Sequence, residues 1–202
     1  DEALKLYPGL KAMTEKSVDP LLTAIKIAIA GNVIDLGIYE RVDMVNDVRK
    51  LTGQELAVND FGKFKTMLEK SRKVIYLGDN AGESVFDRIL IGELNKEVDF
   101  VVREIPVIND CTKEDAVRSG LGGVARIVSS GCEAPATIPA MCRPGFVKEL
   151  EQADMIISKG QGNYEGMSGF GAPIFFLLRA KCPVIARDLG VEVADHILTG
   201  KV

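Results

Sequence analysis

Apolar residues recur at helical spacing through the first part of the chain. Residues 19–38 read DPLLTAIKIAIAGNVIDLGI, with an apolar residue at every third or fourth position. That period puts the apolar residues on one face of a helix and predicts an amphipathic helix against a core. A second helix is expected to begin near Asn59 or Asp60, side chains that can cap a helix, because the apolar period resumes at Phe61.

The period changes to that of a β-strand at Lys73. KVIYL is a short β-rich run that ends in the turn GDNAGE at residues 78–83, and a helical pattern follows as far as Leu94. A strand, a turn and a helix in this order open a β-α-β unit. Further apolar runs predict strand material at 98–110, 125–130 and 154–158. The run IFFLL at 174–178 fits either a strand or a turn of buried helix.

Helix signals lie between these strands. Thr112 and Asp115 have the spacing of a capping box, and Pro144 suits the first position of a helix. Strands that alternate with helices predict a mostly parallel sheet covered on both faces, a three-layer α/β/α fold of the Rossmann-like class. We expect residues 1–70 to form an N-terminal helical cap and residues 71–202 the α/β domain, the two making one functional unit.

Composition supports a folded protein of the cytoplasm. The 202 residues are 47% hydrophobic and 27% charged, with a formal net charge of −4, so a nucleic-acid partner is disfavoured. No apolar run reaches the ~20 residues of a membrane helix, and we expect no membrane partner. None of the four cysteines forms a C-x-x-C pair, which favours reduced thiols in a cytoplasmic protein.

Three polar clusters follow predicted strands, where open parallel sheets bind ligands. In the first two, Asp79 and Asn80 offer adjacent oxygen ligands, and Asp110 offers another carboxylate from the neighbouring strand end. Such hard oxygen donors suit Mg²⁺, Mn²⁺ or a similar octahedral ion. Taken alone, an Asp-Asn pair is as often a turn or a helix cap. The second acidic strand end at Asp110 favours a metal.

In the third cluster, SKGQGNYE, Lys159 follows an apolar strand and precedes Gly160 and Gly162. A lysine there can serve as a point charge for a phosphate, while a glycine loop can offer backbone N–H groups as an anion nest. The alternative is an ordinary surface lysine before a flexible loop. Asn163 and Glu165 can orient a ligand or cap the next element.

Two polar residues interrupt the apolar front section. Asn32 and Asp35 are three apart and share one helical face, so they either point into a site from the cap or mark the helix end after Gly31. Other chemistries find less support. The only histidine, His196, is expected at the surface, which disfavours a catalytic triad or histidine zinc site, and no P-loop sequence is present.

Read together, GNVID at 31–35, GDNAGE at 78–83, IND at 108–110 and SKGQGNYE at 158–165 resemble the metal-dependent damage-control phosphatases, in their archaeal and bacterial branch. The resemblance implies a divalent metal, Mg²⁺ or Mn²⁺ and possibly Co²⁺ or Ni²⁺, on Asp79, Asn80 and Asp110. It also implies a contact between Lys159 and substrate phosphate. These four residues are the expected catalytic set. The residues expected to contact substrate are Asn32, Asp35, Glu83, Gly160, Gln161, Gly162, Asn163 and Glu165.

The resemblance also implies a small phosphorylated substrate, such as a sugar phosphate or a related damaged metabolite. Asp35, Asp79 or a metal-bound water could supply the nucleophile or base. Family members often carry more helical sequence upstream, so a truncated or short variant is expected. Two other readings stay open at this point: an S-adenosylmethionine-dependent carboxyl methyltransferase, and a non-catalytic protein that binds a metal or a phosphometabolite.

Overall fold

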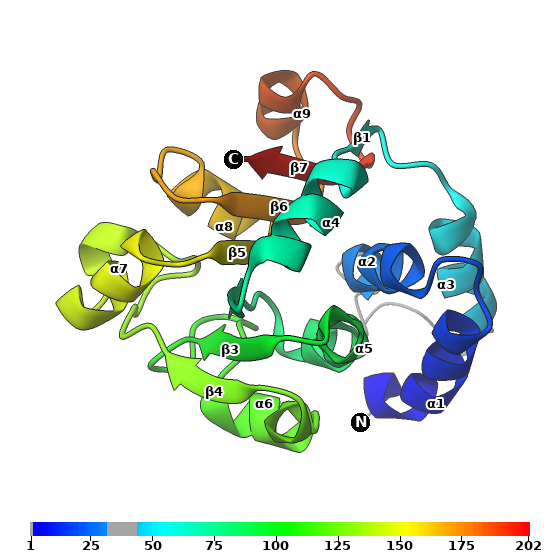
Figure 1. The fold of residues 1–202 in the computed structure, drawn as a ribbon, viewed down its shortest axis with the longest axis horizontal. Helices are drawn as coiled ribbons and strands as arrows, with labels where there is room; N and C mark the ends of the chain where they lie inside the picture. The colour runs from blue at the N-terminus through cyan, green and yellow to red at the C-terminus, as the bar shows by residue number, and fades with distance from the viewer. Residues whose placement is uncertain (1, 32–43) are drawn as a thin grey trace.

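The computed structural model describes residues 2–31 and 44–202. Its front section holds α1 (Glu2–Glu15), α2 (Pro20–Gly31) and α3 (Met44–Gly53), which Figure 1 shows grouped on one side of the molecule next to α5 (Ser84–Leu94). The predicted front helix is therefore confirmed as far as Gly31. Its continuation lies outside the described residues.

The described strands form one seven-stranded sheet in the order β1-β7-β6-β5-β2-β3-β4. The five strands from β6 to β4 are parallel, while β7 runs antiparallel to β6, and β1 pairs in parallel with β7. The sheet is therefore mostly parallel, as predicted. The strands are β1 (Val58–Asn59), β2 (Lys73–Leu77), β3 (Glu97–Val102), β4 (Arg126–Ser129), β5 (Met155–Lys159), β6 (Ile174–Arg179) and β7 (His196–Lys201).

Helices cover both faces of the sheet, which makes the predicted three-layer α/β/α arrangement. Besides α1 to α3 and α5, the structure has α4 (Phe61–Lys70), α6 (Lys113–Arg118), α7 (Pro144–Glu151), α8 (Gly160–Met167) and α9 (Pro183–Leu189). Single 3₁₀ turns are η1 (Ala81–Glu83), η2 (Leu121–Gly123) and η3 (Pro139–Met141). The capping box of Thr112 with Asp115 and the helix start at Pro144 are both confirmed.

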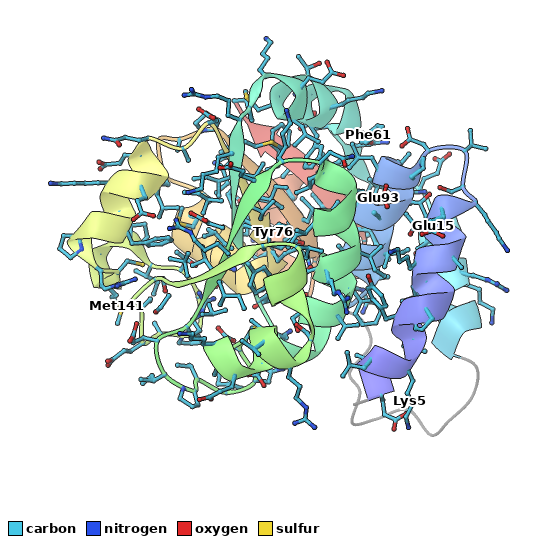
Figure 2. The ribbon with its side chains drawn as sticks, turned by 60° about the horizontal axis from the view of Figure 1, so that its bottom comes forward. Lys5, Glu15, Phe61, Tyr76, Glu93 and Met141 are labelled. Atoms are coloured by element: carbon cyan, nitrogen blue, oxygen red, sulfur yellow. The ribbon has the colours of Figure 1, made fainter. Side chains whose placement is uncertain are left out.

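Successive side chains of β2 belong to two different cores. Val74 and Tyr76 belong to the core that includes α2 and α5, whereas Ile75 and Leu77 belong to the core that includes α7, α8 and α9. Alternation across a strand buried on both faces explains why the run KVIYL is continuously apolar. Figure 2 shows Tyr76 in the middle of the molecule, and it has no exposed surface.

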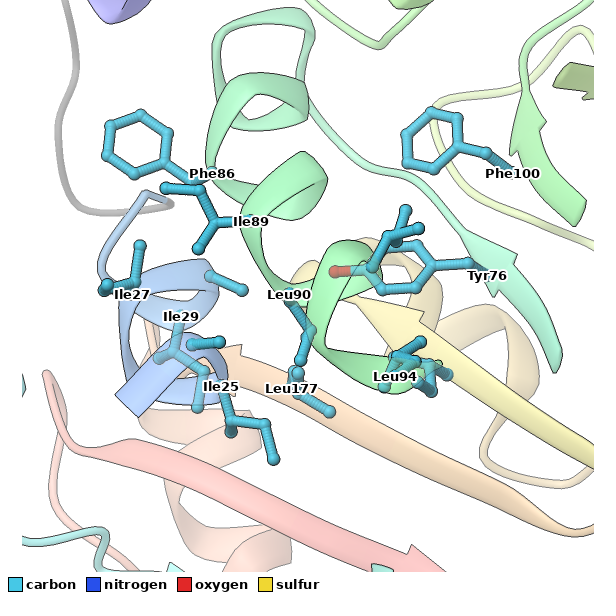
Figure 3. Packing of buried hydrophobic residues seen from close by; sticks show 14 of the residues in the cluster. Ile25, Ile27, Ile29, Tyr76, Phe86, Ile89, Leu90, Leu94, Phe100 and Leu177 are labelled. Atoms are coloured by element: carbon cyan, nitrogen blue, oxygen red, sulfur yellow. The ribbon is translucent and has the colours of Figure 1, made fainter. Parts of the chain in front are cut away.

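The N-terminal helices share the first of these cores with the sheet. Figure 3 shows Ile25, Ile27 and Ile29 of α2 next to α5, and they share a buried core with Leu177 of β6. All three isoleucines have no exposed surface. Through this packing, α2 is joined to α5 and to the sheet.

Three details differ from the sequence analysis. The section before residue 70 is not wholly helical, because Val58–Asn59 adds an edge strand beside β7. The strand expected over residues 98–110 ends at Val102, because the next N–H, that of Arg103, bonds to the carbonyl of Cys111 and the chain turns into a loop. His196 is not a surface residue but a buried one at the start of β7, where burial lowers its pKa.

The strand order reverses between β2 and β5. From β2 the chain continues outward through β3 and β4, then crosses back to β5 on the other side of β2 and continues to β6. Loops that leave two adjacent parallel strands in opposite directions separate above the sheet, and ligands bind in that crevice. The topology thus points to the turn after Leu77 and to Lys159. Among the helices of the described ranges, none is long and apolar enough to cross a bilayer.

Phe64 ties α4 to the sheet and gives a test of this packing. Its ring is fully buried and meets the ring of Phe175 edge-on, with centroids 5.1 Å apart. Replacing Phe64 by alanine leaves a cavity, so we expect the free energy of unfolding to fall by about 3–5 kcal/mol. Urea denaturation followed by circular dichroism measures it. The exposed neighbour Lys65→Ala should change stability by less than about 0.5 kcal/mol; equal effects of both would contradict the packing described.

Candidate active site at the switch point of the sheet

The turn after β2 is joined to the loop that follows β3. Asn80 and Asp110 form an antiparallel bridge, made by two backbone hydrogen bonds of 2.8 Å between their neighbours. The bonds run from Cys111 N–H to the Asp79 carbonyl and from Ala81 N–H to the Asn109 carbonyl. Asp79, Asn80 and Asp110 therefore come together at the carboxyl edge of the sheet. Asp110 reaches this place from a loop and not, as the sequence analysis expected, from a strand end.

The ends of β2 and β5 are in close contact. Gly160, the first residue of α8, has a φ of +79°, and a Cβ added there would lie 1.8 Å from Oδ2 of Asp79. Only glycine fits, because both the backbone conformation and the space exclude a side chain. The sequence analysis expected Gly160 and Gly162 to belong to a loop, but they form the first turn of a helix. The Asp79 carboxylate therefore lies against the backbone of Gly160 at the start of α8.

Lys159 is buried between two carboxylates. Its ammonium donates to Oδ1 of Asp87 at 2.7 Å and to Oε2 of Glu83 at 3.0 Å, and the lysine has no exposed surface. The hydroxyl of Tyr76 donates to the same Oδ1 of Asp87 at 2.7 Å. On the other side, Asn80 Nδ2 donates to Oε1 of Glu83 at 2.6 Å. Glu83 thus accepts hydrogen bonds from both Asn80, a predicted metal ligand, and Lys159, the predicted phosphate lysine.

Arg103 connects the loop of Asp110 to two other segments of the site. This arginine is buried and donates from Nε to Oδ2 of Asp110 at 2.6 Å, from Nη1 to Oγ1 of Thr137 at 3.0 Å and from Nη2 to Oδ1 of Asn163 at 3.0 Å. Asn163 in turn donates to the backbone carbonyls of Gly78 and Lys159. One guanidinium therefore fixes the loop of Asp110 against α8 and the segment around Thr137.

Burial and like charges shift the acidity of the site. Burial, with the nearby carboxylates of Glu83 and Asp110, raises the pKa of Asp79 to about 7. Burial also raises the pKa of Asp87 to about 6, although the Lys159 ammonium opposes that rise. For Lys159 burial would lower the pKa, but the two carboxylates outweigh it and the pKa is raised, so the ammonium stays charged.

The remaining predicted residues divide into three groups. Asn163 is buried, and both its amide oxygen and its amide nitrogen are hydrogen-bonded to other groups of the protein. Gln161 and Glu165 bond to each other at 2.9 Å one helical turn apart on α8, where Glu165 is exposed. Asn32 and Asp35 lie outside the described residues. The ligand and substrate roles of all of these side chains stay predictions.

The donor set suits a hard divalent cation. Four carboxylates, those of Asp79, Glu83, Asp87 and Asp110, surround two buried cations, so negative charge is in excess. Asn80 donates from its amide nitrogen to Glu83. Its amide oxygen, on the other side of the amide, can then serve as a metal ligand. Within the described ranges no three Asp, Glu, His or Cys side chains make a ready cluster. Two carboxylates and one amide oxygen match an ion that keeps water or substrate oxygens as further ligands.

The profile of the Damage-control phosphatase ARMT1-like domain matches residues 1–197. The chain belongs to this family. A damage-control phosphatase of Archaeoglobus fulgidus is 38% identical over 204 residues, and the match covers 96% of this chain and 70% of that protein. One of Pyrococcus horikoshii is 37% identical over 174 residues, covering 83% of this chain and 61% of that protein.

Two further proteins are similar to this chain. An uncharacterized protein of Methanocaldococcus jannaschii is 34% identical over 195 residues, which are 92% of this chain and 64% of that protein. The crystal structure of a DUF89 family protein from Pyrococcus horikoshii superimposes with a TM-score of 0.87 at 33% identity, over 98% of this chain and 72% of that one. The chain thus spans 61% to 70% of the length of these three curated relatives. The fold of a damage-control phosphatase domain is established for it.

Three residues of this site were missed by the sequence analysis. Asp87 follows Glu83 by four positions in a helical pattern, so the spacing alone would have put both acids on one face. Arg103 ends an apolar strand run, where a charge is unusual. Tyr76 gave no signal, because an aromatic residue inside a strand is ordinary core.

The raised pKa of Asp79 predicts that this residue destabilises the metal-free fold. Between its ordinary pKa of 3.8 and about 7, the folded carboxyl keeps a proton that the unfolded chain releases, so stability falls as pH rises through that window. In the presence of a chelator, Asp79→Asn should therefore be more stable than the parent protein by up to about 4 kcal/mol at pH 8. The difference should vanish near pH 4. Urea denaturation at both pH values measures it.

Asp99 provides a matched substitution with the opposite sign. Burial would raise its pKa, but ion pairs with Arg126 and Lys73 outweigh burial and hold the pKa below its ordinary value. A lowered pKa stabilises the fold above pH 4, so Asp99→Asn should destabilise the protein at pH 8. If Asp79→Asn also lowers stability at pH 8, the electrostatic account of Asp79 is wrong.

Proposed function

We propose that this protein is a metal-dependent phosphomonoester hydrolase that acts on a small phosphorylated metabolite, such as a sugar phosphate or a related damaged metabolite. Membership of the damage-control phosphatase family supports the reaction class, and two of its relatives carry that name. One observation carries the proposal. The bridged loops of Asn80 and Asp110, the buried ammonium of Lys159 and the start of α8 all lie where the strand order of the sheet reverses.

Asp79, Asn80 and Asp110 would hold the divalent cation, Mg²⁺ or Mn²⁺, with Co²⁺ or Ni²⁺ as further candidates. When bound, such an ion withdraws charge from a phosphoryl oxygen and orients the group. The side chains beside it have separate tasks. Arg103 fixes Asp110 through Oδ2, which leaves Oδ1 for the ion. Glu83 orients the amide of Asn80 in the same way.

Two further groups of this chain would bind the remaining phosphoryl oxygens. Lys159 keeps its charge because its pKa is raised. Glu83 connects it to the proposed metal ligands, because the Glu83 carboxylate accepts hydrogen bonds from both Lys159 and Asn80. The first turn of α8 presents backbone N–H groups and the positive end of the helix dipole at the same place. Preorganised donors of this kind stabilise charge that develops in a transition state without reorganising.

Asp79 is also suited to proton transfer. A carboxyl with a pKa of about 7 is partly protonated and partly ionised at neutral pH, which is the range where a general acid or base works best. Bound to a cation, the same group would be ionised, because a nearby positive charge favours the carboxylate. We therefore assign Asp79 to metal binding first, and leave the base or nucleophile open among the candidates of the sequence analysis.

The reaction class can be tested with a generic aryl phosphate ester. Protein stripped by a chelator should release no phosphate, and added Mg²⁺, Mn²⁺, Co²⁺ or Ni²⁺ should restore release. Asp79→Ala should abolish both metal binding and turnover, because it removes a charged ligand from the site. Colorimetric phosphate release and isothermal titration with Mn²⁺ measure the two effects. No release from folded, metal-loaded protein with aryl or sugar phosphates, or full activity of Asp79→Ala, would contradict the proposal.

Gly160 gives a more selective test, because a matched glycine exists elsewhere. Gly160→Ala would place a methyl group on the Asp79 carboxylate and push it away, so Mn²⁺ affinity and activity should fall at least about 10-fold. Gly190 has a similar φ of +68° but faces open space. Gly190→Ala should therefore lose only about 1–2 kcal/mol of stability from backbone strain. If both variants keep full Mn²⁺ affinity, Asp79 is not a ligand.

A further inference from the structure

A chain of hydrogen bonds runs from the core of the molecule to the edge of the site. It starts at the Tyr76 hydroxyl, passes through Asp87, Lys159 and Glu83, and ends at the Asn80 amide, with donor–acceptor distances of 2.7, 2.7, 3.0 and 2.6 Å. The first three residues have no exposed surface at all. Figure 3 shows Tyr76 pointing from β2 towards α5, the helix that carries Asp87.

This arrangement is costly for a purely structural element. Taking an ammonium and two carboxylates out of water carries a large desolvation cost for each ion, and well-packed apolar side chains would stabilise a core as well or better. The cost is increased at Asp87, because its Oδ2 is buried and has no hydrogen-bond partner among the described residues. Both donors to Asp87 go to Oδ1. The two hydrogen bonds fix the position of Oδ1, while the unpaired Oδ2 lowers the stability of the fold.

Oδ1 of Asp87 determines where the lysine ammonium lies. A lysine side chain has a flexible four-carbon stem, so a single ion pair leaves its end free to move. Here Asp87 and Glu83 take two of its three N–H donors, which fixes the direction of the third. Tyr76 has a rigid ring in the sheet, and its hydroxyl fixes Asp87 in turn.

We propose that Asp87, held by Tyr76, is a positioning residue that directs the third N–H of the Lys159 ammonium towards the phosphoryl group. The inference rests on the proposed phosphatase function. Asp87 does not touch the substrate and acts only through Lys159. A displacement of a binding group by about 1 Å can lower a rate about 100-fold, so loss of this support affects turnover more than substrate affinity.

The first test is a double-mutant cycle on the phosphatase assay. Asp87→Ala should lower kcat about 100-fold with little change in KM. Asp87→Asn, which keeps the Oδ1 acceptor, should recover kcat to within about 10-fold of the parent protein, and Tyr76→Phe should lower it by a similar small factor. In a Lys159→Met background, Asp87→Ala should change kcat by less than about twofold, because its only route of action is gone.

The cycle can also contradict the proposal. A purely structural Asp87 would lower the free energy of unfolding without changing the kcat of the folded fraction, and its effect would be the same with or without Lys159. If Asp87→Ala does not fold, Tyr76→Phe replaces it in the cycle. Additive effects of Tyr76→Phe and Lys159→Met would then overturn the inference.

The second test does not depend on hydrolysis. In metal-free protein labelled with ¹⁵N-lysine, the buried and doubly bonded Lys159 ammonium should give a slowly exchanging N–H signal in NMR, which Lys159→Met removes and so assigns. The signal should persist in Asp87→Asn and disappear in Asp87→Ala or weaken in Tyr76→Phe. An unchanged signal in all three variants would refute the positioning role. If no phosphate ester is hydrolysed but these changes occur, the phosphatase proposal fails and the positioning of Lys159 by Asp87 stands.

Discussion

The site depends on the burial of one lysine ammonium between two carboxylates. Lys159 has no exposed surface, and a buried charge survives only if it is paired and hydrogen-bonded. Glu83 and Asp87 supply those bonds from η1 and α5, directly after the turn that carries Asp79 and Asn80. The ion pairs therefore lock the end of β5 to the segment that follows β2.

The same constraint explains the residues around it. Because the two strand ends are drawn together, α8 must begin where Asp79 already lies, and only a glycine can occupy its first position. Burial, together with the nearby carboxylates, raises the pKa of Asp79. The guanidinium of Arg103 neutralises the carboxylate of Asp110. If the proposed cation binds here, it offsets the repulsion between the carboxylates, and the fold should be more stable with the cation than without it.

The sequence predicted the fold class and most elements, because strands buried on both faces and helices with clear capping residues carry strong local signals. It also predicted that Asp79, Asn80 and Asp110 meet. It missed β1 and β7, since a two-residue edge strand has no period and HILTGK is too polar to resemble a core strand. It could not show that Asp110 comes from a loop, or that Tyr76 and Arg103 hold the site. Those facts depend on long-range contacts that no local pattern contains.

The most direct measurement is the structure of a crystal grown with Mn²⁺ and inorganic phosphate, with the metal located by its anomalous scattering. The account predicts a metal peak at about 2.0–2.2 Å from oxygens of Asp79, Asn80 and Asp110. It also predicts a phosphate that bridges this ion to the Lys159 ammonium and the first turn of α8. A metal bound elsewhere, or a phosphate that leaves the switch point of the sheet empty, would contradict the assignment of this site.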